Sequence, residues 1–283
     1  MALQAAKHSF IFEIAGLRLA LYGPDTTSLH QLACRYRRFR SLGPPHLEVE
    51  IETVGQMSTA TEEARGENTP SEQAMHFDGG VLRFAAGGYE GEVDVAQGRA
   101  WQHLSSVDPL EDIEYFLRVC TALLAFEHGS VLLHAAGLRR GGQGYAFFGP
   151  SGSGKTTVAR LSPDAEVLND DLVLLQQEQG QWHVHGTPFW NPTQVRPGKV
   201  THAPLRALYH LVQDREVYLE PLPKAKALAR LIASTPLIAA HPERLPRLLD
   251  LHQRLLAEVP VCDLHFRPDP SFWALIDHDG IAD

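Results

Sequence analysis

Alternating apolar and polar positions dominate the first part of the chain. Residues 47–53 read LEVEIET, a strict period of two that predicts a half-buried strand. Residues 8–22 are rich in β-branched and aromatic side chains around a turn residue, Gly16, so they predict a hairpin. Glycine-containing turns at residues 77–80 and 96–99 predict two further hairpins. The pattern therefore indicates several short strands joined by tight turns.

The period of the pattern changes after residue 108. Residues 109–128 place their apolar side chains three and four positions apart, which predicts an amphipathic helix. We therefore expect two regions: a mostly antiparallel β region over residues 1–108 and an α/β domain with a mixed sheet over residues 109–283. The polar residues 55–76 are expected to form a long loop in the first region.

Strand-like and helical segments alternate through the second region. Further strands are predicted at residues 131–138, 145–150, 166–175, 182–185, 205–219 and 259–267. Helices are predicted from residue 158 onward, over residues 224–258 and near residues 272–276. Such alternation is typical of α/β folds.

Composition and charge narrow the class of protein. Of the 283 residues, 44% are hydrophobic and 21% are charged, as in ordinary globular proteins. No apolar run reaches about 18 residues, so no membrane partner is expected. The net charge of −9 argues against nucleic acid as a partner. The cysteines Cys34, Cys120 and Cys262 fit neither a disulfide framework nor a zinc site, which favours a cytoplasmic protein. A homo-oligomer remains open.

A phosphate-binding loop is the clearest motif. Residues 145–161 read YAFFGPSGSGKTTVARL, which predicts a strand, a glycine-rich loop and a helix. The loop fits G-x-x-x-x-G-K-[ST] from Gly149 to Thr156. The glycines let backbone N–H groups point into one hollow, and Lys155 adds a positive charge for the phosphates. An ordinary glycine turn before a helix is the weaker interpretation, because both flanking elements are predicted.

The motif predicts both a nucleotide and a metal ion. The Thr156 hydroxyl is suited to hold Mg²⁺, and the lack of a guanine-specifying N/T-K-x-D motif favours ATP. The residues expected to bind the nucleotide are Gly149, Ser151, Gly152, Ser153, Gly154, Lys155, Thr156 and Thr157.

Paired acids follow the loop in an unusual setting. Asp170 and Asp171 lie in the apolar segment VLNDDLVLL, where carboxylates are costly unless they are paired or bound to a cation. The expected cation is Mg²⁺ held against Thr156. Because neighbouring strand residues point opposite ways, one acid can hold the metal while the other meets a substrate hydroxyl. The alternative is an Asp pair that ends the strand in a turn.

A histidine, His134, lies one predicted strand before the loop, in SVLLHAAGL. Taken alone, it is more simply interpreted as a core histidine with satisfied hydrogen bonds. However, LLHAAGL, YAFFGPSGSGKTT and EVLNDDLVLL, in this order and spacing, resemble the catalytic domain of the HPr kinase/phosphorylase family. The resemblance covers residues 129–200 and implies a nucleotide-binding core like that of phosphoenolpyruvate carboxykinase.

The resemblance implies a role for each matching residue. Lys155 and Thr156 would grip ATP and Mg²⁺, with Lys155 also neutralising the transferred phosphoryl group. Asp170 would accept the proton of the acceptor hydroxyl, and Asp171 would assist it or hold the metal together with Thr156. His134 would lie beside the pair. The implied catalytic residues are thus Asp170, Asp171, His134 and Lys155.

Other parts of the chain depart from that family. HPr kinases have a second signature, Glu-x-Arg-Gly, after the paired acids, and the nearest match here, residues 183–186, reads HVHG and lacks the metal-binding carboxylate. The N-terminal and C-terminal segments do not resemble those of HPr kinase/phosphorylase. The chain is therefore more similar to divergent HPr-kinase-like proteins, some of which resemble peptide-modifying serine kinases of biosynthetic clusters.

Several charged residues near the motifs allow two interpretations each. His183 and His185 fit a substrate-facing loop and an aromatic-rich turn equally well. Arg196 and Lys199 could reach the γ-phosphate, although a solvated basic loop is favoured. The dipeptide at 139–140 (RR) is expected in a solvent-exposed turn.

We expect an ATP-dependent kinase that transfers the γ-phosphoryl group to a hydroxyl. A serine of a peptide or protein is the favoured acceptor, and a small molecule is the alternative. A non-catalytic ATP-binding or scaffold protein of a biosynthetic cluster is a competing hypothesis, motivated by the missing glutamate. A nucleotide hydrolase or switch is another.

Overall fold

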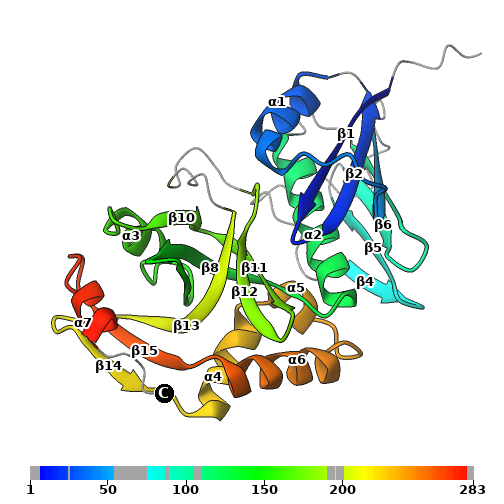
Figure 1. Cartoon of the computed structure of the whole chain (residues 1–283). Coiled ribbons are helices and arrows are strands. Elements are labelled where there is room, and N and C mark those ends of the chain that lie inside the picture. The colour runs from blue at the N-terminus through cyan, green and yellow to red at the C-terminus, as the bar shows by residue number, and fades with distance from the viewer. Residues whose placement is uncertain are drawn as a thin grey trace, which may run out of the picture. The chain divides into compact units, whose positions relative to one another are not determined.

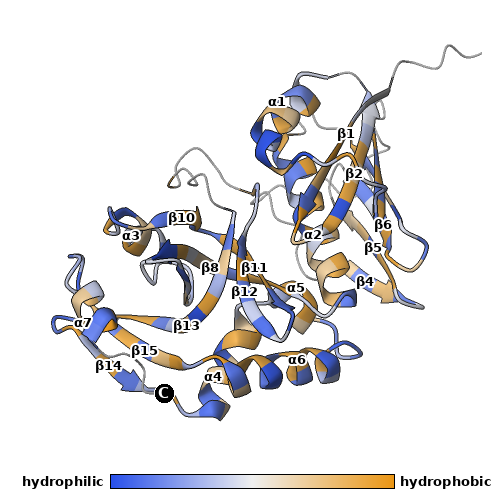
Figure 2. Ribbon diagram, in the orientation of Figure 1, coloured by the Kyte–Doolittle hydropathy of each residue, from blue (hydrophilic) through white to orange (hydrophobic). Residues whose placement is uncertain are grey.

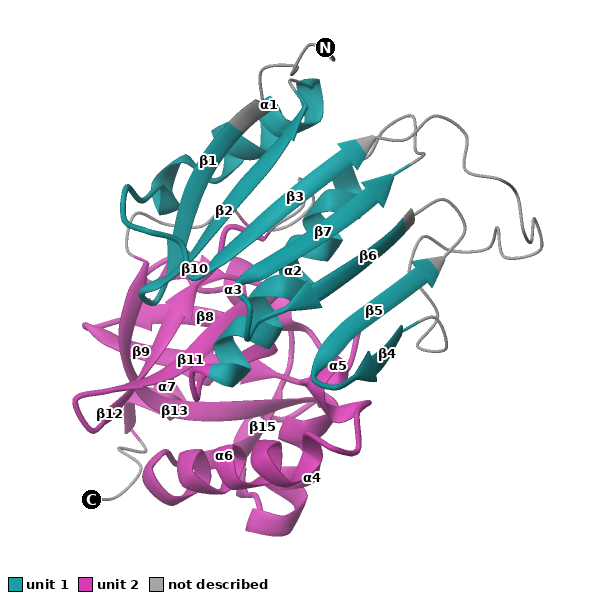
Figure 3. Ribbon diagram, turned by 90° about the vertical axis from the view of Figure 1, so that its right-hand side faces the viewer, with its two compact units in different colours: residues 1–127 teal, residues 128–283 magenta. Residues whose placement is uncertain are grey.

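The computed structural model describes residues 7–24, 26–53, 75–86, 89–104, 110–189, 195 and 201–278. The chain divides into two compact units, residues 1–127 and residues 128–283, drawn in teal and magenta in Figure 3. The expected long loop at residues 55–76 lies outside the described residues, except for its last two positions, which belong to a strand. Arg196 and Lys199 lie outside them as well.

The first unit is built on a seven-stranded mixed sheet. Its strands are β1 (Lys7–Ile14), β2 (Leu17–Pro24), β3 (Leu47–Thr53), β4 (Met75–Asp78), β5 (Val81–Ala86), β6 (Tyr89–Asp94) and β7 (Arg99–Leu104). They lie in the order β1-β2-β3-β7-β6-β5-β4. The three predicted hairpins are confirmed as β1/β2, β4/β5 and β6/β7. However, β3 runs parallel to both β2 and β7, so the sheet is not antiparallel throughout.

Two helices accompany this sheet (Figure 1). Helix α1 (Thr27–Arg35) was not predicted; it begins after Thr26, whose hydroxyl accepts a hydrogen bond from N of Leu29 at 3.4 Å. With the 3₁₀ turn η1 (Arg37–Phe39), it connects β2 to β3. Because parallel neighbours cannot be joined by a tight turn, this crossover explains why β3 is parallel to β2.

Helix α2 (Leu110–Glu127) belongs to the first unit. Its apolar side chains, such as Phe116 and Leu117, are fully buried, and it packs against α1, β2, β3 and β7. An ion pair between Arg35 and Glu114 joins the two helices. This helix was expected in the second region, because its pattern shows that one face is buried but not which sheet buries it.

The second unit is built on an eight-stranded mixed sheet. Its strands are β8 (Val131–Arg140), β9 (Gln143–Phe148), β10 (Glu166–Asn169), β11 (Leu172–Glu178), β12 (Gln181–Gly186), β13 (His202–Gln213), β14 (Tyr218–Pro221) and β15 (Val261–Phe266). They lie in the order β10-β8-β11-β12-β13-β15-β14, with β9 paired to both β8 and β13. Strand β13 is parallel to β9 and to β15. The unit is therefore α/β with a mixed sheet, as expected.

Five of these strands close into a ring. Strand β8 pairs with β11, β11 with β12, β12 with β13, β13 with β9, and β9 with β8 again. Glycines make room inside this small barrel: a Cβ atom on Gly137 would lie 2.7 Å from Cγ1 of Val173. A Cβ atom on Gly144 would collide with Val184. Both glycines also face Val184 of β12, a strand that pairs with neither β8 nor β9, so they are needed because the walls of the ring approach closely there.

Two predicted strands are interrupted in the structure. The segment 166–175 divides into β10 and β11 at the paired acids. The segment 205–219 divides into β13 and β14, because the Asp214 carboxylate accepts hydrogen bonds from N of Arg215 and N of Glu216 and so forms a turn.

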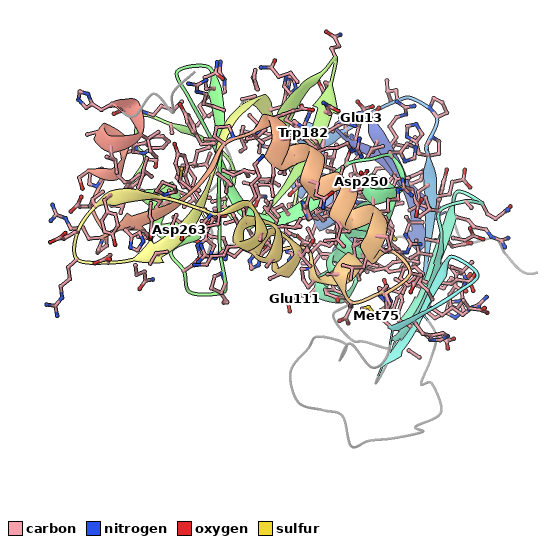
Figure 4. All side chains as sticks on the ribbon, turned by 90° about the horizontal axis from the view of Figure 1, so that it is seen from below. Glu13, Met75, Glu111, Trp182, Asp250 and Asp263 are labelled. Atoms are coloured by element: carbon pink, nitrogen blue, oxygen red, sulfur yellow. The ribbon has the colours of Figure 1, made fainter. Side chains whose placement is uncertain are left out.

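Helices cover both faces of the sheet around β13 and β15. Helices α3 (Lys155–Arg160) and α7 (Phe272–His278) pack on one face, in a core with Tyr209 of β13 and Phe266 of β15. Alternate residues of the same strands point to the other face, where His210 and Asp263 meet Arg230 of α4 (Lys224–Ala233). Figure 4 shows Asp263 close to this helix.

Two further helices, α5 (Pro236–Ala239) and α6 (Leu245–Glu258), pack together with α4. Helix α6 buries Leu248, Leu251 and Leu255 along one side, and Figure 2 shows apolar and polar residues alternating along this helix. The spacing of three and four matches the helical period predicted for residues 224–258.

Candidate active site

The glycine-rich loop joins β9 to α3 in the second unit. Strand β9 ends in two fully buried phenylalanines, and α3 begins at Lys155 directly after the loop. Gly154 has a φ of +110°, and a Cβ atom there would lie 2.5 Å from Cζ of Phe266. A side chain at this position would therefore meet a backbone penalty and a steric one. The strand, loop and helix predicted for residues 145–161 are thus present.

Hydrogen bonds hold this loop in a closed turn. The Lys155 side chain is buried, and its Nζ donates to O of Gly149 at 3.0 Å and to O of Pro150 at 3.1 Å. Gln213, the last residue of β13, donates from Nε2 to O of Gly152 at 2.8 Å. The loop is therefore shaped by its own contacts, with the lysine folded onto its backbone.

The other predicted loop residues differ in exposure. Ser151 and Gly152 are exposed, whereas Thr157 on α3 is half-buried. Ser153 is buried, and its Oγ has no hydrogen-bond partner in the described part of the chain. Because buried polar atoms are nearly always paired, this hydroxyl needs a partner that the described residues do not supply.

A buried asparagine shapes the segment that carries the paired acids. Oδ1 of Asn169 accepts hydrogen bonds from N of Asp171 at 2.7 Å and N of Leu172 at 2.9 Å. Its Nδ2 donates to O of Thr187 at 3.1 Å and O of Phe189 at 2.8 Å. These bonds end β10, bend the chain and begin β11. The sequence analysis did not single out Asn169, although an Asn before a break between strands is a recognised turn signal.

Asp170 turns toward the glycine-rich loop. It is only 1% exposed, and its carboxylate accepts hydrogen bonds from the Thr156 hydroxyl and, at 3.2 Å, from N of Val195. Burial raises the pKa of Asp170; the two hydrogen bonds oppose that rise, and the charge of Asp171 adds to it. The other carboxylate oxygen, Oδ1, is buried and has no partner among the described residues.

Asp171 turns toward His134 instead. Its Oδ1 lies 3.2 Å from Nε2 of His134, and both side chains are partly exposed. Burial lowers the pKa of Lys155, and the charge of Asp171 acts in the opposite direction. The structure therefore brings the predicted residues together: Lys155, Thr156, Asp170, Asp171 and His134 lie around one end of β8, β9 and β11.

Other charged residues from the sequence analysis lie elsewhere. His183 and His185 are on strand β12, not on a loop beside the acids. Arg139 forms an ion pair with Glu166 at 2.6 Å, and Arg140 forms one with Asp277 at 2.8 Å. The two arginines thus have structural partners.

Two features are absent from the described residues. No helix in this part of the chain is long and apolar enough to cross a membrane. No three of its His, Cys, Asp or Glu side chains, as they lie, are arranged to hold a metal ion.

Residues 113–278 match the family model described as SynChlorMet cassette protein ScmC. This match covers more than half of the chain and includes the loop, the paired acids and His134. The chain belongs to this family. No curated protein sequence matches it.

Among solved structures, the chain is similar to the Hpr(Ser) kinase/phosphatase from Coxiella burnetii. The similarity covers 53% of this chain and 96% of that one, with 11% sequence identity and a TM-score of 0.31. The structural relationship is weak, so the assignment of function depends on the site itself.

Proposed function

We propose that the chain is an ATP-dependent kinase that phosphorylates a hydroxyl, with a serine of a peptide or protein as the favoured acceptor. The observation that carries the proposal is the pairing of Thr156 with Asp170 beside the phosphate-binding loop, next to the pairing of Asp171 with His134. Phosphoryl transfer needs positioning and charge neutralisation, which such an arrangement can supply.

The residues present fit ATP and Mg²⁺. Two buried atoms, Oγ of Ser153 and Oδ1 of Asp170, lack partners among the described residues, and both lie beside the loop. The backbone of residues 149–156 and the Lys155 ammonium would hold the phosphates, and Lys155 would give up its two carbonyl contacts to do so. Thr156 and an acid would hold Mg²⁺, which, when bound, neutralises charge on the phosphate oxygens.

The contacts favour exchanging the two roles that the resemblance implied for the acids. Asp170 meets the Thr156 hydroxyl and is buried, so it suits the metal side of the site. Asp171 is partly exposed and pairs with His134, so it can reach an incoming hydroxyl and accept its proton. His134 orients this carboxylate and balances its charge when protonated.

Two variants test the proposal and the roles of the acids. Asp171→Asn is expected to bind ATP·Mg²⁺ normally and to transfer phosphate about 100- to 10,000-fold more slowly, the usual loss when a general base is removed. Asp170→Asn is expected to weaken the Mg²⁺-dependent part of ATP binding, measured by calorimetry with and without Mg²⁺. Asp164→Asn, at an exposed position of the same unit, is the control.

Transfer is measured with γ-labelled ATP against serine-containing peptides and small alcohols. If Asp171→Asn transfers phosphate at the wild-type rate, the base assignment is wrong. If wild-type protein binds ATP but labels no acceptor, the scaffold hypothesis is supported; acceptor-free ATP turnover would support a hydrolase. The scaffold hypothesis has one observation in its favour, the histidines on β12 where HPr kinases have a glutamate.

The proposed setting of this reaction is the cytoplasm. The cysteines Cys34, Cys120 and Cys262 form no disulfide in the described part of the chain, which fits a reducing compartment.

A further inference from the structure

Three histidines and a glutamate gather on one side of the ring of strands. His183 and His185 alternate along β12 and therefore point the same way. His202 of β13 is the direct cross-strand partner of His185. Glu178 of β11 reaches the same group from the end of its strand. The four side chains come from three neighbouring strands.

The four side chains are close enough to share a ligand. The ring centres of His185 and His202 are 5.3 Å apart, those of His183 and His185 6.2 Å, and those of His183 and His202 6.3 Å. Oε1 of Glu178 lies 2.9 Å from Nε2 of His185, and Oε2 lies 3.9 Å from Nδ1 of His183. The carboxylate thus sits between two imidazoles of the same strand.

One atom of this group is left without a suitable partner. His185 is more than nine-tenths buried, and its Nε2 makes no hydrogen bond of acceptable geometry, although it is close to Glu178. A buried ring nitrogen that is aimed at a carboxylate without bonding to it is unusual. A cation coordinated by His185 and the carboxylate would give this nitrogen a partner.

We propose that His183, His185 and His202, with Glu178, form a binding site for a divalent transition-metal ion of the zinc type. Imidazole nitrogens and a carboxylate oxygen are ligands that zinc prefers, and three histidines with one further position are a common donor set. This site is separate from the proposed ATP·Mg²⁺ site and does not depend on the proposed kinase activity.

The side chains must adjust slightly to bind the ion. In a tetrahedral site with Zn–N distances of about 2.0–2.1 Å, the ring centres lie about 5 Å apart. The ring centre of His183 lies 6.2 Å from that of His185 and 6.3 Å from that of His202, little more than 1 Å beyond this ideal separation. The donor atoms therefore do not yet converge on one point. The buried ring, His185, already faces the carboxylate, whereas His202 is exposed and His183 half-buried, so these two rings can turn at little cost.

Metal binding would join β11, β12 and β13 on the side where β12 ends and β13 begins. These two strands flank residues 187–201, and one residue of that segment, Val195, donates to Asp170. The ion would therefore act as a structural clamp that joins the end of β12 to the start of β13, the two strands between which Val195 lies in the chain. Four side-chain ligands would leave no open coordination position, as in structural sites.

The test uses the full chain without a polyhistidine tag, stripped with a chelator and assayed in the absence of nucleotide. Titration with Co²⁺ should give visible absorption bands typical of tetrahedral coordination, which saturate at one equivalent, and Zn²⁺ should displace the Co²⁺. His183→Ala and His202→Ala should each weaken binding by at least about 10-fold. Neither substitution removes a fully buried side chain, so both variants should fold.

The control is His103→Ala. His103 also lies on a strand, with Glu52 and Glu90 each 3.3 Å away, but it has no second histidine beside it among its recorded partners. The His103→Ala variant should bind Co²⁺ with unchanged affinity. Failure of the wild-type chain to bind Co²⁺ saturably would overturn the proposal, as would unchanged affinity in both His183→Ala and His202→Ala. Loss of kinase activity would bear only on the other site.

Discussion

Replacing Asn169 by Ala should destabilise the second unit more than any exposed substitution. The change removes two hydrogen bonds that the side chain accepts, from N of Asp171 and N of Leu172, and those that it donates, to O and Oγ1 of Thr187 and to O of Phe189. A buried hydrogen bond contributes about 1 kcal/mol net, and a buried group left unpaired costs about 1–3 kcal/mol. Since some partners will find water, the expected loss is about 3–6 kcal/mol of unfolding free energy.

The assay is urea unfolding of the full chain, combined with hydrogen exchange at the amide of Leu172, which should lose protection. Gln177→Ala is the matched control, because its exposed amide also donates two hydrogen bonds, to the Glu258 carboxylate. Exposed substitutions usually change stability by about 0.5 kcal/mol or less. A loss under about 1 kcal/mol for Asn169→Ala would refute the idea that this amide holds the bend of the paired acids.

Three further predictions concern the same unit. Lys155→Ala should abolish measurable ATP binding in calorimetry, and retained affinity would contradict the role of the loop. Gly154→Ala should cost about 2 kcal/mol or more of stability, since φ is +110° and the new methyl would meet Phe266; a change under about 0.5 kcal/mol in urea unfolding would count against it. Burial lowers the pKa of His252 in the folded chain from 6.5 to about 4. As the pH falls from 6.5 to 4, this imidazole therefore takes up a proton in the unfolded chain before it does so in the folded chain. The unfolding free energy should therefore fall by up to about 3 kcal/mol between pH 6.5 and pH 4, and less so in His252→Leu; parallel pH profiles for the two proteins would disprove this.

The local features of this protein could be predicted from the sequence. The loop at residues 149–156 depends on glycines and a lysine that are adjacent in the chain, and the hairpins depend on turns of a few residues. The pairing of Asp171 with His134 was expected only as nearness, from the resemblance. Which acid faces which partner could not be predicted, because the bend at Asn169 overrides the simple alternation of strand side chains.

Features that depend on contacts between residues far apart in the sequence were not predicted. The parallel position of β3 depends on helix α1, which is short and has only a few apolar positions to indicate it. His202 was not connected with His183 and His185, because only the register of β12 and β13 sets them side by side. Likewise, helix α2 carries a clear apolar face, but nothing within its own residues specifies the sheet that it covers.

The closed ring of strands has a consequence for how the chain is made. Strands β8, β9, β11 and β12 are synthesised before β13, and in the order β9-β8-β11-β12 they form an open sheet whose two edges, β9 and β12, are closed only by β13. Until residue 213 has left the ribosome, both strands therefore present unpaired edges, and such edges recruit other chains. A transcript cut before residue 202 should yield an aggregating product rather than a smaller folded unit, and slow translation across β13 should increase the demand for chaperones.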